Sequence, residues 1–111
     1  MLASPAVAQS GELLMRQIPK SGELLPAVGL GTAYVFDSND NTTRQKASAV
    51  LQALVAGGGR LVDTASVYRD AEAVLGEVIA PADLRDRLFI ATKLEAPDAA
   101  ELKRSQTRLQ M

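Results

Sequence analysis

The 111-residue sequence contains neither cysteine nor histidine. Without cysteine it cannot form a disulfide, and without both residue types it lacks the usual nitrogen and sulfur ligands of zinc, so no metal site is expected. A Ser-His-Asp triad, a Cys-His pair and any imidazole general base are excluded from these residues as well. Chemistry on this chain would therefore depend on carboxylates, lysine, tyrosine or a borrowed cofactor.

Aromatic residues are also scarce, with two phenylalanines, two tyrosines and no tryptophan, so the core must be aliphatic. The net charge is only −1, and the two signs are interspersed, which argues against nucleic acid or an anionic membrane as a partner. No apolar run reaches the roughly 18–20 residues that a membrane span needs. The composition, 47% apolar and 23% charged, is that of one ordinary globular domain.

Residues 1–14 differ from the remainder of the chain. Ala6-Val7-Ala8 has the A-x-A form of a signal-peptidase site, but the basic and long apolar regions of a signal peptide do not precede it. We expect either a disordered tail or the remnant of a clipped export signal. The location is cytoplasmic by default, and periplasmic or secreted if the signal was clipped. A coherent pattern begins at Met15.

From Met15 onward the pattern predicts an α/β fold. Residues 15–26 form a predicted hairpin with its turn at 20–23, where Gly22 tolerates a positive φ. Three short apolar strands follow at 28–31, 60–63 and 88–92, and each precedes a predicted helix, at 43–56, 70–80 and 98–109. Glu101, three residues after Asp98, suggests a capping box at the start of the last helix. Strands alternating with amphipathic helices indicate a parallel sheet covered by helices.

Two architectures fit this order: a doubly wound sheet and a (β/α)8 barrel. The dinucleotide fingerprint of a doubly wound sheet needs Gly-x-Gly-x-x-Gly, whereas here Gly29-x-Gly31 is followed by Tyr34 and a long loop. In a barrel, functional groups gather at the carboxyl ends of successive strands. Thr32, Asp63 and Lys93 lie at such ends, which favours the barrel.

Three motifs at these strand ends resemble the aldo-keto reductases: GLGT at 29–32, LVDTASVY at 61–68 and LFIATK at 88–93. The spacing D-T-A-x-x-Y from Asp63 to Tyr68 is that of the family. The resemblance implies that residues 15–111 are the N-terminal hairpin and the first three β/α units of a (β/α)8 barrel, the N-terminal part of an NADP-dependent oxidoreductase domain. It further implies an enzyme that uses NADPH to reduce a small aldehyde or ketone to an alcohol.

Carried over by position, the resemblance makes Tyr68 the proton donor to the substrate carbonyl, supported by Asp63 and Lys93. It places Gly31, Thr32 and Asp63 beside the cofactor. Physical chemistry agrees with this assignment, because a free phenol is too weak an acid near neutral pH and a neighbouring lysine cation lowers its pKa. Asp63 would pair with Lys93, which would satisfy a carboxylate that is costly to bury and would aim the ammonium.

The sequence also departs from the family. The family's fourth catalytic residue, a histidine at the end of strand four, would lie beyond Met111, and three of eight units are present. Ala33 stands where many relatives carry a large aromatic residue, while Glu72 and Gly76 fit the family pattern in a segment of slightly different length. We expect these 111 residues to be part of a longer enzyme, and alone to be inactive and prone to aggregate through an open sheet edge.

Two alternatives stay open from the residues alone. The chain could belong to a non-catalytic binding or regulatory protein that keeps the aldo-keto reductase scaffold. It could also be a different β/α protein, in which Asp63 caps a turn, Tyr68 packs and Lys93 is a solvated strand end. Neither the substrate nor the oligomeric state is indicated by this sequence.

Overall fold

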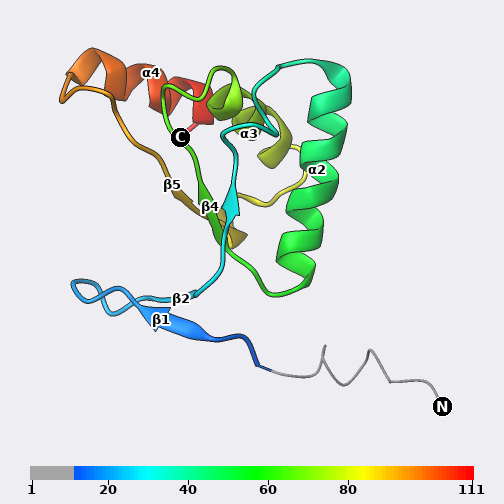
Figure 1. Ribbon diagram of the computed structural model, residues 1–111, viewed down its shortest axis with the longest axis vertical. Helices are drawn as coiled ribbons and strands as arrows, with labels where there is room; N and C mark the ends of the chain where they lie inside the picture. Colours follow the sequence, from blue (N-terminus) through cyan, green and yellow to red (C-terminus); the bar gives the residue numbers. More distant parts are fainter. Residues whose placement is uncertain (1–11) are drawn as a thin grey trace.

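The computed structural model of the protein describes residues 12–111 (Figure 1). The Ala6-Val7-Ala8 motif and its signal-peptide interpretation lie outside this part. The elements in chain order are β1 (Met15–Gln17), β2 (Leu24–Pro26), β3 (Leu30–Gly31), α2 (Asn41–Ala56), β4 (Leu61–Asp63), α3 (Ala71–Ile79), a 3-10 turn (Arg85–Arg87), β5 (Phe89–Ala91) and α4 (Ala99–Leu109). The predicted order of hairpin and three strand–helix units is confirmed, with strands shorter than expected.

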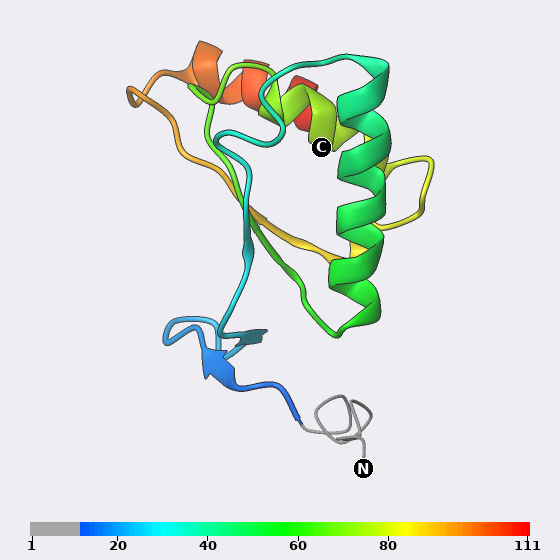
Figure 2. The same cartoon turned by 45° about the vertical axis from the view of Figure 1, so that its right-hand side comes forward.

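Strands β1 and β2 form the predicted antiparallel hairpin, with Met15 opposite Pro26. Its turn contains Gly22 at φ +77, and the amide of Gly22 donates to the carbonyl of Ile18 at 2.8 Å. A side chain at that φ would be strained, so glycine fits this turn for a backbone reason. The hairpin lies beyond the amino ends of the other strands, away from α3 and α4 (Figures 1 and 2).

Strands β3, β4 and β5 form a parallel sheet in chain order. Leu30, Val62 and Ile90 stand in register and belong to or pack against the core that the helices cover, and Val62 is fully buried. The neighbouring positions Leu61 and Asp63 are only partly buried. Helices therefore cover one face of the described sheet, and sequential strands are neighbours. A barrel segment has this arrangement, and so does one half of a doubly wound sheet, in which the helices change face only at the switch point.

Helices α2 and α4 each follow an aspartate whose side chain accepts a hydrogen bond from a free backbone amide of the first turn. Asp40 accepts from the amide of Thr43 at 2.7 Å before α2, and Asp98 accepts from the amide of Ala100 at 2.9 Å before α4. The capping box expected at α4 was wrong, because the amide of Asp98 donates to the carbonyl of Ala96 and Glu101 turns elsewhere. Among residues 12–111, none of the helices combines the length and apolarity needed to cross a membrane.

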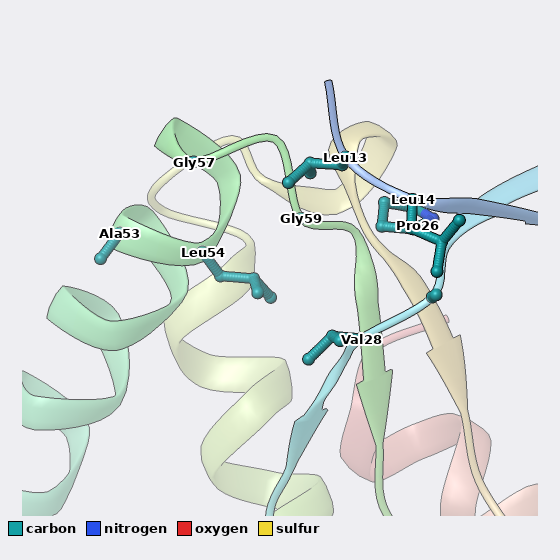
Figure 3. Close-up of a pocket in the computed structure, with 9 residues that line it drawn as sticks. Leu13, Leu14, Pro26, Val28, Ala53, Leu54, Gly57 and Gly59 are labelled. Carbon is teal, nitrogen blue, oxygen red and sulfur yellow. The ribbon is translucent and has the colours of Figure 1, made fainter. Parts of the chain in front are cut away.

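An apolar groove of about 340 Å³ lies between the hairpin and the end of α2 (Figure 3). Leucine, valine, alanine, proline and glycine line it, among them Leu13, Val28 and Leu54. None of these side chains can accept or donate a proton, and the groove lies at the amino ends of the strands. The search for a reactive site therefore turns to the carboxyl ends.

Candidate active site

The carboxyl ends of β4 and β5 bring a carboxylate and an ammonium group together. Asp63 is the last residue of β4, and Lys93 lies two residues beyond β5. Lys93 Nζ donates to Asp63 Oδ1 and Oδ2, each at 2.9 Å, and to the carbonyl of Thr64 at 2.8 Å. These three acceptors match the three donors of an ammonium group, so the cation is fixed in position. The predicted Asp63–Lys93 pair is confirmed.

Tyr68 lies in the loop between β4 and α3, with its ring centre 5.1 Å from Lys93 Nζ. That distance is within the range of a cation–π contact. The loop is tightened by a hydrogen bond of 3.1 Å from the amide of Tyr68 to the carbonyl of Ala65, and the next residue, Arg69, has φ +49. A hollow opens beside the tyrosine and the lysine, lined also by Ala65, Leu94 and Glu95. The three expected catalytic residues are thus neighbours, at the edge of an open hollow.

The ion pair reinforces the positive charge of the lysine. The hydrogen bond to Asp63 raises the pKa of Lys93 above its usual value, and the neighbouring Tyr68 adds to this effect. Lys93 therefore stays a cation at neutral pH. The expected burial of the carboxylate was wrong, since the side chains of Lys93 and Asp63 are 53% and 48% exposed. The two side chains are held by each other and by the carbonyl of Thr64 in the loop after β4.

Of the three residues expected beside a cofactor, Gly31 ends β3, Thr32 follows it, and Asp63 ends the neighbouring strand β4. Gly31 is exposed, and no atom lies within 4 Å of the place where a Cβ would stand, so its backbone can be approached closely. Thr32 is fully buried, and its hydroxyl donates to the backbone carbonyl of Asp63 at 3.0 Å. Thr32 thereby ties the end of β3 to the end of β4. Contact of Gly31, Thr32 or Asp63 with a cofactor stays a prediction.

Two further carboxylates, one in α3 and one in α4, accept hydrogen bonds from residues next to the site. Glu101 in α4 accepts hydrogen bonds from Ser66 Oγ and from the amides of Glu95 and Ala96. Glu72 in α3 is 1% exposed and accepts from Thr92 Oγ1 at 2.7 Å. Sequence reasoning assigned Glu101 to a local cap and left Glu72 without a role. The one available signal was Glu72's position in the apolar stripe of α3, where a carboxylate needs a partner.

The sequence profile described as the Aldo/keto reductase family matches residues 27–110. An aldo-keto reductase of Mycolicibacterium smegmatis is 40% identical over 75 residues, which are 67% of this chain and 24% of that protein. The methylglyoxal reductase YeaE of Escherichia coli is 39% identical over 82 residues, which are 71% of this chain and 28% of that protein. The chain thus spans about a quarter of the length of these curated relatives.

Solved structures of aldo-keto reductases also superpose on this chain. An aldo/keto reductase from Klebsiella pneumoniae, in complex with NADP and acetate, superposes with a TM-score of 0.68 and 34% identity, covering 81% of this chain and 33% of that one. The thermostable aldo-keto reductase Tm1743, in complex with the inhibitor epalrestat, gives a TM-score of 0.70 and 26% identity, covering 89% of this chain and 39% of that one. The chain belongs to the aldo/keto reductase family and has the architecture of part of its barrel.

Proposed function

We propose that the protein containing these residues is an NADPH-dependent carbonyl reductase that converts a small aldehyde or ketone to an alcohol. The observation that carries the proposal is the arrangement of Tyr68, Lys93 and Asp63 at adjacent strand ends beside an open hollow. Family membership supports it, as do the relative in Escherichia coli that is a methylglyoxal reductase and the Klebsiella structure in complex with NADP. Methylglyoxal is therefore a reasonable first substrate to test.

In the proposed reaction, Tyr68 donates the phenolic proton to the carbonyl oxygen of the substrate. Lys93 stands beside the ring and stabilises the negative charge that develops on the phenol oxygen as the proton leaves. Asp63 takes no part in the transfer but holds the ammonium through two hydrogen bonds. When bound, NADPH would supply the hydride that the carbonyl carbon needs, and with the proton from Tyr68 this would give the alcohol.

The residues at the strand ends fit a flat ring lying against them. Gly31 offers an exposed backbone with no neighbouring atom where a side chain would stand. Thr32 is fully buried and ties the end of β3 to the backbone carbonyl of Asp63, so it would support this edge from within, while Gly31 and the half-exposed side chain of Asp63 would face the ring. The preference for NADPH over NADH rests on the relatives. Residues 1–111 alone supply three β/α units, and we expect them to be inactive without the rest of a barrel.

The test is the substitution Tyr68→Phe in the full-length protein. We expect kcat for carbonyl reduction to fall by at least roughly 100-fold, since proton donation by a positioned side chain contributes about that much. The binding of NADPH, followed by quenching of its fluorescence, should persist. Tyr34→Phe is the comparison variant, because Tyr34 is 89% exposed and lines a neighbouring hollow together with Tyr68; turnover kept in Tyr34→Phe and lost in Tyr68→Phe would assign proton donation to Tyr68.

Two outcomes would contradict the proposal. Full turnover by Tyr68→Phe would remove Tyr68 from the chemistry. A wild-type protein that binds NADPH but reduces no aldehyde or ketone would favour a non-catalytic binding protein on the same scaffold. If the wild-type protein did not bind NADPH at all, the charged strand ends would be structural.

A further inference from the structure

Two loops carry the candidate active site, and they contact each other at several points. The loop of residues 64–70 carries Tyr68, and the loop of residues 92–98 carries Lys93. Their backbones are joined by a hydrogen bond of 2.9 Å from the amide of Ser66 to the carbonyl of Lys93. The relative placement of phenol and ammonium therefore depends on how these loops are held together.

One carboxylate joins the same two loops through side-chain bonds. Glu101 Oε1 accepts from Ser66 Oγ, two residues before Tyr68, and from the amide of Glu95 at 3.0 Å, two residues after Lys93. Glu101 Oε2 accepts from the amide of Ala96 at 3.1 Å. The carboxylate thus makes one bond to the tyrosine loop and two to the lysine loop.

The environment of Glu101 is that of an ionised acceptor. Its side chain is 9% exposed and belongs to the first turn of α4, where the helix dipole favours negative charge. The hydrogen bond from Ser66, followed by those from the amides of Glu95 and Ala96, lowers the pKa of Glu101. A buried carboxylate with three donors is fixed in direction, which makes it suited to hold loops rather than to exchange protons.

A purely local role for Glu101 does not account for these contacts. A capping glutamate would accept from the amide of Asp98, but that amide donates to the carbonyl of Ala96. The helix is capped by the side chain of Asp98, which accepts from the amide of Ala100. The oxygens of Glu101 are instead directed to the two loops.

We propose that Glu101 is a positioning residue of the active site, which acts through Ser66 to hold the loop of Tyr68 against the loop of Lys93. The proposal rests on the proposed reductase function. Neither residue touches the reacting atoms. A displacement of about 1 Å in a positioned catalytic group can lower a rate by up to about 100-fold, so loss of this link should be visible in kcat.

The decisive variant is Ser66→Ala in the full-length protein, because it removes the side-chain bond between the tyrosine loop and Glu101 and leaves in place both amide bonds of Glu101 and the backbone bond from Ser66 to Lys93. We expect kcat to fall by roughly 10-fold or more, while the dissociation constant for NADPH and the melting temperature stay near wild type. Ser66→Thr keeps a hydroxyl and should restore most of the activity. Ser48→Ala is the matched control, since Ser48 accepts from Gln52 in α2 and has no bond to either loop among the described contacts.

Hydrogen–deuterium exchange tests the link without any turnover. In Ser66→Ala, the amides of residues 64–70 should exchange faster, whereas those of Glu95 and Ala96 should stay protected. In Glu101→Ala, both sets should exchange faster. A fall in kcat with these exchange patterns supports the proposal.

Unchanged kcat in Ser66→Ala, or a fall that Ser66→Thr does not restore, overturns it. If the wild-type protein reduces no carbonyl, the proposed function fails, and exchange alone then decides whether the link exists. Faster exchange of residues 64–70 in Ser66→Ala would support a link between the loops, and unchanged exchange would refute it.

Discussion

The packing of α3 against α4 can be tested at one glycine. A Cβ built at Gly76 would collide with the backbone carbonyl oxygen of Arg108, and it would lie 3.1 Å from the carbonyl carbons of Arg108 and Leu109. The obstacle is main chain in the last turn of α4, so no side-chain rotation can relieve it. Gly76→Ala must push the two helices apart or distort one of them.

The expected cost follows from two opposing effects. Overpacking of a close contact costs about 1–3 kcal/mol, and a backbone collision belongs at the upper end of that range. Replacing glycine by alanine inside a helix recovers about 1 kcal/mol. The net loss is therefore roughly 2 kcal/mol, which corresponds to a fall in melting temperature of about 4–8 °C for a domain of 150–250 residues.

The assay is thermal unfolding of the full-length protein, followed by circular dichroism. Gly57→Ala is the matched control, since Gly57 has φ −81 and its added Cβ would meet only the carbonyl oxygens of Ala53 and Leu54 at 3.4 and 3.7 Å. Gly57→Ala should leave the melting temperature unchanged or raise it slightly. Equal melting temperatures for Gly76→Ala and Gly57→Ala would refute the argument from close helix packing.

Three further predictions concern charged groups. Arg108→Met should destabilise the protein by about 1–3 kcal/mol in urea titrations, because Arg108 Nη1 lies 3.5 Å from Glu72 Oε2 and the carboxylate is 1% exposed; an unchanged midpoint would show that Glu72 needs no cation. The lowered pKa of Glu101 means that its contribution to stability is present above the ordinary value of 4.5 and is lost as the pH falls through the folded pKa. The urea midpoint of the wild type should therefore fall more steeply between pH 6 and pH 3 than that of Glu101→Gln. Parallel curves for the two proteins would contradict this prediction. Asp63→Asn should lower kcat for carbonyl reduction by roughly 10-fold or more, because the ammonium of Lys93 loses its charged partner. A wild-type kcat in steady-state kinetics of this variant would show that Asp63 does not support Lys93 in the reaction.

Much of the site could be predicted because parallel strands in chain order bring their carboxyl ends together. Asp63 and Lys93 are 30 residues apart, yet the register of β4 and β5 places Asp63 opposite Ala91, two residues before Lys93. Short apolar strands and amphipathic helices were sufficient to predict that order. The pair follows from the register once both residues are assigned to strand ends.

The contacts of Glu101 and Glu72 could not be predicted in the same way. They depend on the path of the loops, and in particular on residues 92–98 folding back so that the amides of Glu95 and Ala96 meet the first turn of α4. Local spacing favoured a cap for Glu101, since Asp98 stands three residues earlier. Tertiary contacts prevailed because two loop amides and a hydroxyl satisfy the carboxylate better than the single amide of Asp98, which has another acceptor.

The exposure of the Asp63–Lys93 pair has a functional implication. An ion pair in which both side chains are about half exposed contributes only about 0–1 kcal/mol to stability. The ammonium of Lys93 is nevertheless fixed more firmly than such a small contribution to stability would need, because it donates two hydrogen bonds to Asp63 and one to the carbonyl of Thr64. In the proposed reductase, such fixation would serve the placement of charge beside Tyr68 more than the stability of the fold. If substrate and cofactor bind as proposed and exclude water from the hollow, the influence of that charge should grow, because the same distance then acts through a lower effective dielectric constant.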